Sequence, residues 1–163
     1  MIGAGRNKTI LSGYILIVEG TKEKEKRVVL KDMTMMGGSS GNQGGNGLFV
    51  RNGLSFLCDS MTFTQCRGTG VFARNTKGRL INCVITQCYY NGIYSSNDAL
   101  IELEGDQTKV HGNCTSGVGF GLKTFDTSSR IHLLFPLTKE SVSTNNGGGN
   151  NYGGEGTIVE FDE

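Results

Sequence analysis

The sequence predicts an all-β solenoid in a single domain, because a six-residue phrase recurs at a fixed period between segments with strand chemistry. The phrase begins with Gly and ends with Asn, and its copies are GLFVRN (47–52), GVFARN (70–75) and GIYSSN (92–97). Successive copies start 23 and 22 residues apart, and Gly117 continues the series after 25 residues. A period of this size is typical of stacked supersecondary units.

A second phrase repeats with the same period. TFTQC ends at Cys66 and VITQC ends at Cys88, 22 residues later, and Asn113 follows after a further 25 residues. The spacing between copies changes from 22 to 25 residues for both phrases, as expected if both belong to one repeating unit. We therefore treat the stretch from the first copy onward as a series of similar coils.

The segments inside each repeat alternate as β-strands do. Leu48 and Val50 share one face of their segment, and Val71 and Ala73 occupy the matching positions in the next copy. These segments are short, rich in Val, Ile, Phe and Thr, and broken by Gly and Asn. Several short strands per repeat, without a helix between them, predict one coil of a β-solenoid.

The elements are expected in the following order. Partial coils lie at residues 8–18 and 27–36, full coils begin at Leu48, Val71, Ile93 and Val118, and a last rung lies at 156–163. The residues that begin the four full coils should form one interior column. A second interior column should consist of Met61, Cys83 and Thr108, and one turn position should be occupied by Cys66, Cys88 and Asn113.

Three stretches leave the coils. Residues 19–27 carry charges of alternating sign, which is typical of a solvated hairpin tip. Residues 37–47 and 145–156 are rich in Gly and Asn and are expected to be turns, since neither matches a phosphate-binding loop.

The overall composition limits the classes of partner. The chain has 163 residues with 26 Gly and one Pro, and its formal net charge is +1. Because no overall field attracts polyanions, we expect no nucleic acid partner. The longest apolar run, 14–18, is much shorter than a membrane span, and residues 1–6 lack the apolar stretch of a signal peptide. We expect no membrane partner, and the cellular compartment is left open.

The five cysteines favour free thiols over a metal site or a disulfide framework. Their number is odd and they form no CxxC pair. A bridge between Cys66 and Cys88 is conceivable, but stacked strands hold their Cβ atoms too far apart for relaxed geometry. Reduced, buried thiols are typical of a reducing, intracellular compartment.

At this point the chain resembles a family. IGAGRNKTILSG (2–13) is similar to the first-coil phrase of pectin-lyase-like and pectin-methylesterase-like proteins, and NGIYSSN and NCVITQC are similar to their later coils. The resemblance covers about residues 2–122. It implies a right-handed parallel β-helix, here of about six short coils, and an acidic polysaccharide as one class of ligand. Since a short solenoid has open ends, the chain is also expected to be part of a larger protein or to self-associate.

The resemblance implies catalytic residues only in fragments. Polygalacturonases use the phrases NTD, DD, GHG and RIK, and this chain holds Asn97-Asp98, His111-Gly112 and Arg130-Ile131 without completing any of them. Asp98, His111 and Arg130 are therefore the candidates for a lyase or epimerase acting on acidic polysaccharide. For such an enzyme these three side chains have to converge in one cleft.

Two carboxylates form a candidate cation site. Glu102 and Glu104 point to the same side of a predicted strand, away from the interior. Two carboxylates on one outer face could hold Ca²⁺, and the alternative is a solvated outer face.

An outward stripe of aromatic and basic side chains is the leading candidate site. If Leu48 and Val50 point inward, alternate residues of the same coils point outward. They are Phe49, Arg51, Phe72, Arg74 and Tyr94. We predict a non-catalytic module that presents this stripe to an acidic polysaccharide or a protein partner. The alternative is that the loop 37–47 or the C-terminal tail covers the stripe.

Overall fold

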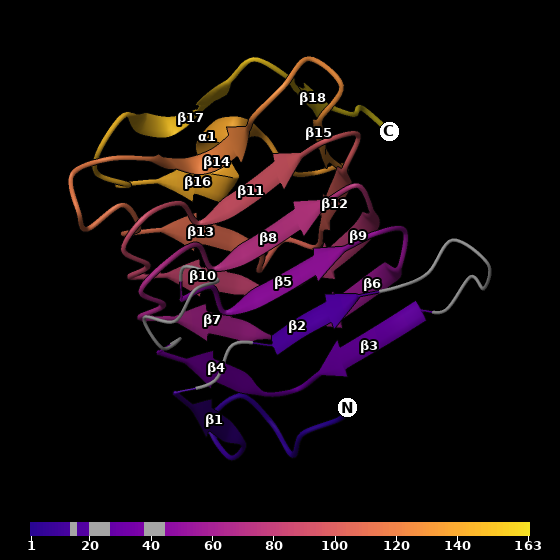
Figure 1. Ribbon diagram of the computed structural model, residues 1–163, viewed down its shortest axis with the longest axis vertical. Helices are drawn as coiled ribbons and strands as arrows, with labels where there is room; N and C mark the ends of the chain where they lie inside the picture. The colour runs from indigo at the N-terminus through magenta and orange to yellow at the C-terminus, as the bar shows by residue number, and fades with distance from the viewer. Residues whose placement is uncertain (14–15, 20–26, 38–44) are drawn as a thin grey trace.

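The computed structural model describes residues 1–13, 16–19, 27–37 and 45–163. In this part of the chain, three parallel sheets of six strands each stack into a β-solenoid (Figure 1). The predicted fold class, an all-β parallel solenoid, is confirmed. Most of the predicted charged excursion (20–26) and of the first Gly/Asn loop (38–44) lies outside the described residues.

Each coil contributes one strand to each sheet. Sheet I contains β2 (Leu16–Glu19), β5 (Leu48–Arg51), β8 (Val71–Arg74), β11 (Ile93–Ser96), β14 (Phe120–Thr124) and β17 (Asn150–Gly154). Sheet II contains β3 (Arg27–Lys31), β6 (Ser55–Asp59), β9 (Lys77–Ile81), β12 (Leu100–Glu104), β15 (Arg130–Leu133) and β18 (Thr157–Glu160). Sheet III contains β1 (Ile10–Ser12), β4 (Thr34–Met36), β7 (Thr62–Thr64), β10 (Val84–Thr86), β13 (Lys109–His111) and β16 (Ser143–Thr144).

The described residues make five complete coils. The coils run from β2–β3–β4 to β14–β15–β16, with β1 before them and β17 and β18 after them. A single helical turn, α1 (Lys139–Val142), precedes β16. No helix of the described residues is long and apolar enough to cross a membrane.

One interior column differs from the prediction. Leu48, Val71 and Ile93 are paired in register, but the next residue in the column is Leu122. Val118, which was predicted there, is 57% exposed in the preceding turn. The reason is a longer turn: Gly70 follows Cys66 by four residues, whereas the corresponding Gly121 follows Asn113 by eight. The fourth copy of the phrase is therefore GLKTFD (121–126).

The Gly at the start of each phrase is required by crowding. A Cβ on Gly47 would lie 2.8 Å from Cys66 Sγ and 2.8 Å from the Gly70 carbonyl oxygen. A Cβ on Gly92 would collide with the side chain of Val110. At these positions the backbone turns into sheet I directly over the core of sheet III, and this leaves no room for a side chain.

The Asn at the end of each phrase adopts the left-handed conformation. Asn52, Asn75 and Asn97 have φ of 62°, 50° and 51°, which Asn tolerates better than most residues. These residues turn the chain from sheet I into sheet II. Gly and Asn thus recur because each coil has the same two demanding backbone positions.

The predicted second column and the turn stack are both buried. Met61, Cys83 and Thr108 are fully buried next to strands of sheet III. Asn113 accepts a hydrogen bond from the Cys88 backbone N–H at 3.1 Å and pairs with Asn146 of the next coil at 3.0 Å. The turn stack therefore runs Cys66, Cys88, Asn113, Asn146, with side-chain amides linking its last coils.

None of the five cysteines forms a disulfide, and all five are buried. Burial raises the pKa of Cys83 to about 12 and that of Cys114 to about 11. At neutral pH these thiols are protonated, and they pack as small apolar groups.

Candidate functional site

The three aromatic side chains of the predicted stripe stack on the outer face of sheet I. The ring centroids of Phe49 and Phe72 are 4.6 Å apart with an interplanar angle of 11°, and those of Phe72 and Tyr94 are 4.6 Å apart with an angle of 14°. This spacing matches the distance between neighbouring strands. Because each ring covers the next, the stack exposes mainly ring edges. Phe49 is only 4% exposed, which contact with Phe72 on one face does not by itself explain.

At its Tyr94 end, the aromatic stack contacts one basic side chain and one further aromatic side chain. In β14, Lys123 lies opposite Tyr94, with its Nζ 5.2 Å from the centre of the Tyr94 ring. Phe125, just after β14, packs edge-on against Tyr94 with centroids 6.1 Å apart and is itself 54% exposed. Phe125 is therefore the most exposed aromatic side chain at this end of the stripe.

The two arginines of the stripe differ. Arg51 forms an ion pair with Glu19 at 2.9 Å, and Asn52 donates a second hydrogen bond to the same carboxylate at 2.6 Å. The hydrogen bond from Arg51 lowers the pKa of Glu19. Arg74, one strand further along, is exposed and forms no ion pair with another described residue. The charge available to a ligand is therefore that of Arg74.

Arg74 lies between two shallow hollows. One hollow combines it with aromatic and polar groups: Phe72, Tyr94, Ser96, Asn97 and Phe125. The other lies over the turn from sheet I to sheet II and is lined by Arg51, Asn52, Asn75, Asn97 and Asp98. Burial raises the pKa of Tyr94, so its phenol remains protonated at neutral pH. Together these hollows offer the unpaired cation of Arg74, the carboxylate of Asp98, amides, a phenol and aromatic carbon.

Two segments were predicted as alternatives that could cover the stripe, and the structure describes one of them. β17 lies at the opposite end of sheet I from β5, so this C-terminal strand does not cover Phe49. The loop 37–47 is the other predicted cover, and most of it (38–44) lies outside the described residues.

The three catalytic candidates come from three different parts of the coil. Asp98 lies in the turn after β11, His111 ends β13 of sheet III, and Arg130 begins β15 of sheet II. The hollows that Asp98 lines contain neither His111 nor Arg130. The described structure therefore brings no acid–base set of these three residues together.

Glu102 and Glu104 face outward from β12 and surround an arginine. Arg79 of β9 donates to Glu102 through Nε at 2.9 Å and Nη2 at 2.7 Å, and to Glu104 through Nη1 at 3.3 Å. The carboxylates raise the pKa of Arg79, mainly through the hydrogen bond to Glu102. No group of three or more potential metal ligands occurs within the described part of the chain. The expected Ca²⁺ site thus already holds a protein cation between its carboxylates.

Comparison of the chain with models of protein families, with curated proteins and with solved structures gives no match. The coils themselves support a parallel β-solenoid, and membership of the pectin-lyase-like superfamily stays an inference from the resemblance.

Sequence reasoning missed two parts of the site. The ion pair that neutralises Arg51 joins residues 32 positions apart, across a stretch without the repeat phrase. Phe125 was missed because the fourth copy was aligned to Gly117. Aligning that copy to Gly121 instead places Phe125 at the position of Arg51 and Arg74, so the signal was present in the sequence.

Proposed function

We propose that this solenoid is a non-catalytic binding module whose hollow around Arg74 holds an acidic glycan. The observation that carries the proposal is the exposed Arg74 beside Tyr94 and Phe125 in one hollow. An arginine binds a carboxylate or sulfate group well, and aromatic carbon packs against the C–H faces of a sugar. The resemblance of residues 2–13 to pectin-lyase-like proteins supports the same class of ligand.

The character of the hollow favours a glycan. The exposed amides of Asn75 and Asn97 add donors and acceptors for hydroxyl groups. Because the stacked rings expose edges rather than faces, contact with a sugar ring is expected mainly at Phe125. A flat, open site of this kind binds through several weak contacts along a chain.

A glycan lyase or epimerase is the alternative. It requires a base close to the acidified proton, and Asp98, His111 and Arg130 do not share a described hollow. Incubation with polygalacturonate, monitored by ultraviolet absorbance for an unsaturated product, separates the two functions. A steady increase in absorbance that depends on the protein would contradict a binding-only role.

The binding test compares two arginines that carry the same charge. Oligogalacturonate binding to the native protein is measured by calorimetry at low and moderate salt. Arg74→Gln should weaken binding about fivefold and reduce its salt dependence, because it removes one direct ion pair. Arg67→Gln, on an exposed turn between β7 and β8, removes the same charge elsewhere and should change affinity less than twofold. Equal effects of the two changes would overturn the proposed site.

A further inference from the structure

A second row of cations runs along sheet II. In sheet II, Arg27 is paired with Ser55, and Leu100 is paired with both Lys77 and Arg130. Ser55 and Lys77 each precede the first pair of β6 and β9, Phe56–Gly78, and they line the same hollow. Basic side chains therefore occur on every second strand. All three are exposed, and none forms an ion pair with another described residue.

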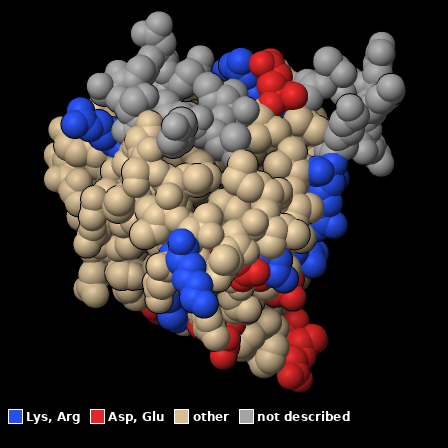
Figure 2. All heavy atoms as spheres, turned by 90° about the horizontal axis from the view of Figure 1, so that it is seen from below, with Lys and Arg blue, Asp and Glu red and all other residues tan. Residues whose placement is uncertain are grey.

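The spacing of this row is regular because the coils are. Neighbouring strands are roughly 4.8 Å apart, so Lys77 and Arg130 lie roughly 10 Å apart along the coil axis. The residues between the cations are Ser55 and Leu100, which offer a hydroxyl group and an apolar surface. Figure 2, which views the molecule from the N-terminal end of the coils, shows Lys and Arg side chains along one flank, with Asp and Glu side chains among them.

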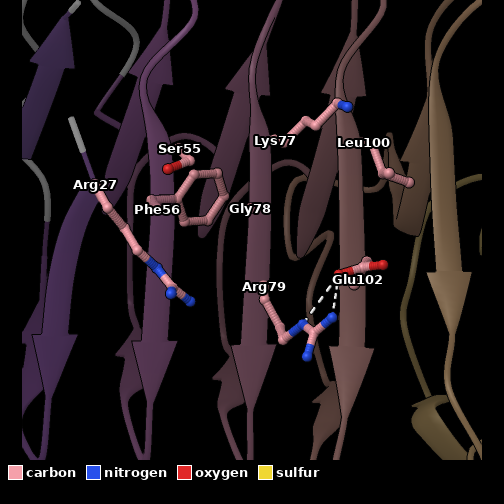
Figure 3. A pocket seen from close by; sticks show the side chains of 8 residues that line it. All are labelled: Arg27, Ser55, Phe56, Lys77, Gly78, Arg79, Leu100 and Glu102. Atoms are coloured by element: carbon pink, nitrogen blue, oxygen red, sulfur yellow. Dashed lines mark hydrogen bonds and ion pairs between the residues drawn. The ribbon is translucent and has the colours of Figure 1, made fainter. Parts of the chain in front are cut away.

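The row borders a hollow on the outer face of sheet II. Its lining includes Arg27, Ser55, Lys77, Gly78 and Arg79 (Figure 3). In Figure 3 the Arg79 guanidinium turns to Glu102, while the Arg27 side chain extends from β3 toward the neighbouring strand without such a partner. Arg79 is thus neutralised, and Arg27 and Lys77 supply the positive charge of the hollow.

The two candidate faces are continuous. A further hollow, lined by Gly53, Ser55, Asn75, Lys77 and Asp98, connects this one to the turn beside Arg74. The site at Arg74 and the hollow at Lys77 therefore adjoin at the turn between sheets I and II.

We propose that sheet II binds a linear glycan lying along the coil axis, with an acidic group on every second sugar. This inference rests on the proposed function and specifies its ligand. One sugar of an extended chain spans about one rung, so a cation on every second strand pairs with an acid on every second sugar. The intervening sugars then face Ser55 and Leu100.

The charge pattern disfavours a nucleic acid at this row. A single DNA strand in the duplex geometry carries one charge per roughly 3.4 Å of the axis, denser than one cation per two β-strands. The Asp98 carboxylate also lies close to the row and repels a dense polyanion. A glycan with widely spaced acids avoids this repulsion.

The test measures binding of three probes to the 163-residue chain by calorimetry. The probes are a hyaluronan octasaccharide, with one carboxylate on every second sugar, a galacturonic acid octasaccharide, with one on every sugar, and a single-stranded DNA octamer. The test variant is Lys77→Gln with Arg130→Gln. The control is Lys8→Gln with Arg67→Gln, which removes two exposed charges away from sheet II.

Hyaluronan affinity should fall roughly tenfold in the test variant and less than twofold in the control. Galacturonate affinity should change less than that of hyaluronan. Equal losses for the two glycans, no loss in the test variant, or tighter binding of DNA than of either glycan would overturn the inference. If Arg74→Gln weakens glycan binding while the test variant does not, the site at Arg74 stands and the row on sheet II is rejected. If neither glycan binds the native protein, both proposals fall.

Discussion

At the scale of single residues, the repeat phrase is explained by one crowded position and one left-handed position in each coil. Gly70 shows the crowding: a Cβ there would lie 2.8 Å from the Gly92 carbonyl oxygen and would collide with Ile85. Gly53 differs: it follows the left-handed Asn52 and itself has a φ of 83°, but a Cβ there would meet no neighbour within 4 Å. The two kinds of glycine should therefore respond differently to substitution.

We predict that Gly70→Ala lowers the free energy of unfolding by about 2–3 kcal/mol, because the added methyl group overpacks the core. Gly53→Asn should cost less than about 1 kcal/mol, because Asn tolerates a positive φ and meets no neighbour. Urea denaturation of both variants provides the measurement. If Gly70→Ala is no less stable than Gly53→Asn, the crowding argument is wrong.

At the scale of elements, the longer turn before β14 decides which residues enter the core. The four extra residues between Asn113 and Gly121 place Val118 in the turn and Leu122 in the interior. Leu122 is fully buried and pairs with Ile93, whereas Val118 is 57% exposed. The extra residues are thus accommodated in the turn before β14, and the register between β11 and β14 is preserved.

We predict that Leu122→Asp lowers the free energy of unfolding by roughly 3 kcal/mol or more, since it buries an unpaired carboxylate. Val118→Asp should change it by less than about 0.5 kcal/mol, because the side chain is in water. Thermal or urea unfolding of the two variants distinguishes the two registers. Comparable destabilisation by both changes would count against the register described here.

At the scale of the whole molecule, the solenoid is a stack in which each coil contacts chiefly its neighbours. Its interior holds all five thiols, spread from Cys58 in the second complete coil to Cys114 in the turn after β13. The ordinary thiol pKa is 9.0, and burial raises it to about 12 for Cys83 and to about 11 for Cys114. Folding is therefore coupled to keeping these thiols protonated.

This coupling predicts a loss of stability at alkaline pH. Below pH 9 these thiols are protonated in both the folded and the unfolded protein, so their contribution to stability is fully present. As the pH rises from 9 towards 11 and 12, the unfolded chain loses these protons first, and the free energy of unfolding decreases. The urea midpoint should be similar at pH 7 and pH 8 and lower at pH 10. Cys83→Ala should show a smaller alkaline decrease than the unchanged protein, although its stability at pH 7 is lower. An equal decrease in the two proteins would refute the role of Cys83.

Most of the fold and part of the candidate site follow from local features of the sequence. Three features can be read along the chain: the period, the alternation within segments, and the Gly and Asn at fixed places. Together they predicted the solenoid and the row Phe49, Phe72, Tyr94. The neutralisation of Arg51 by Glu19, the burial of Leu122 instead of Val118 and the cation row Arg27, Lys77, Arg130 depend on which residues of different coils lie side by side. That neighbourhood is determined by turns of unequal length and by strand pairing, because hydrogen bonding between coils, rather than distance along the chain, sets the register.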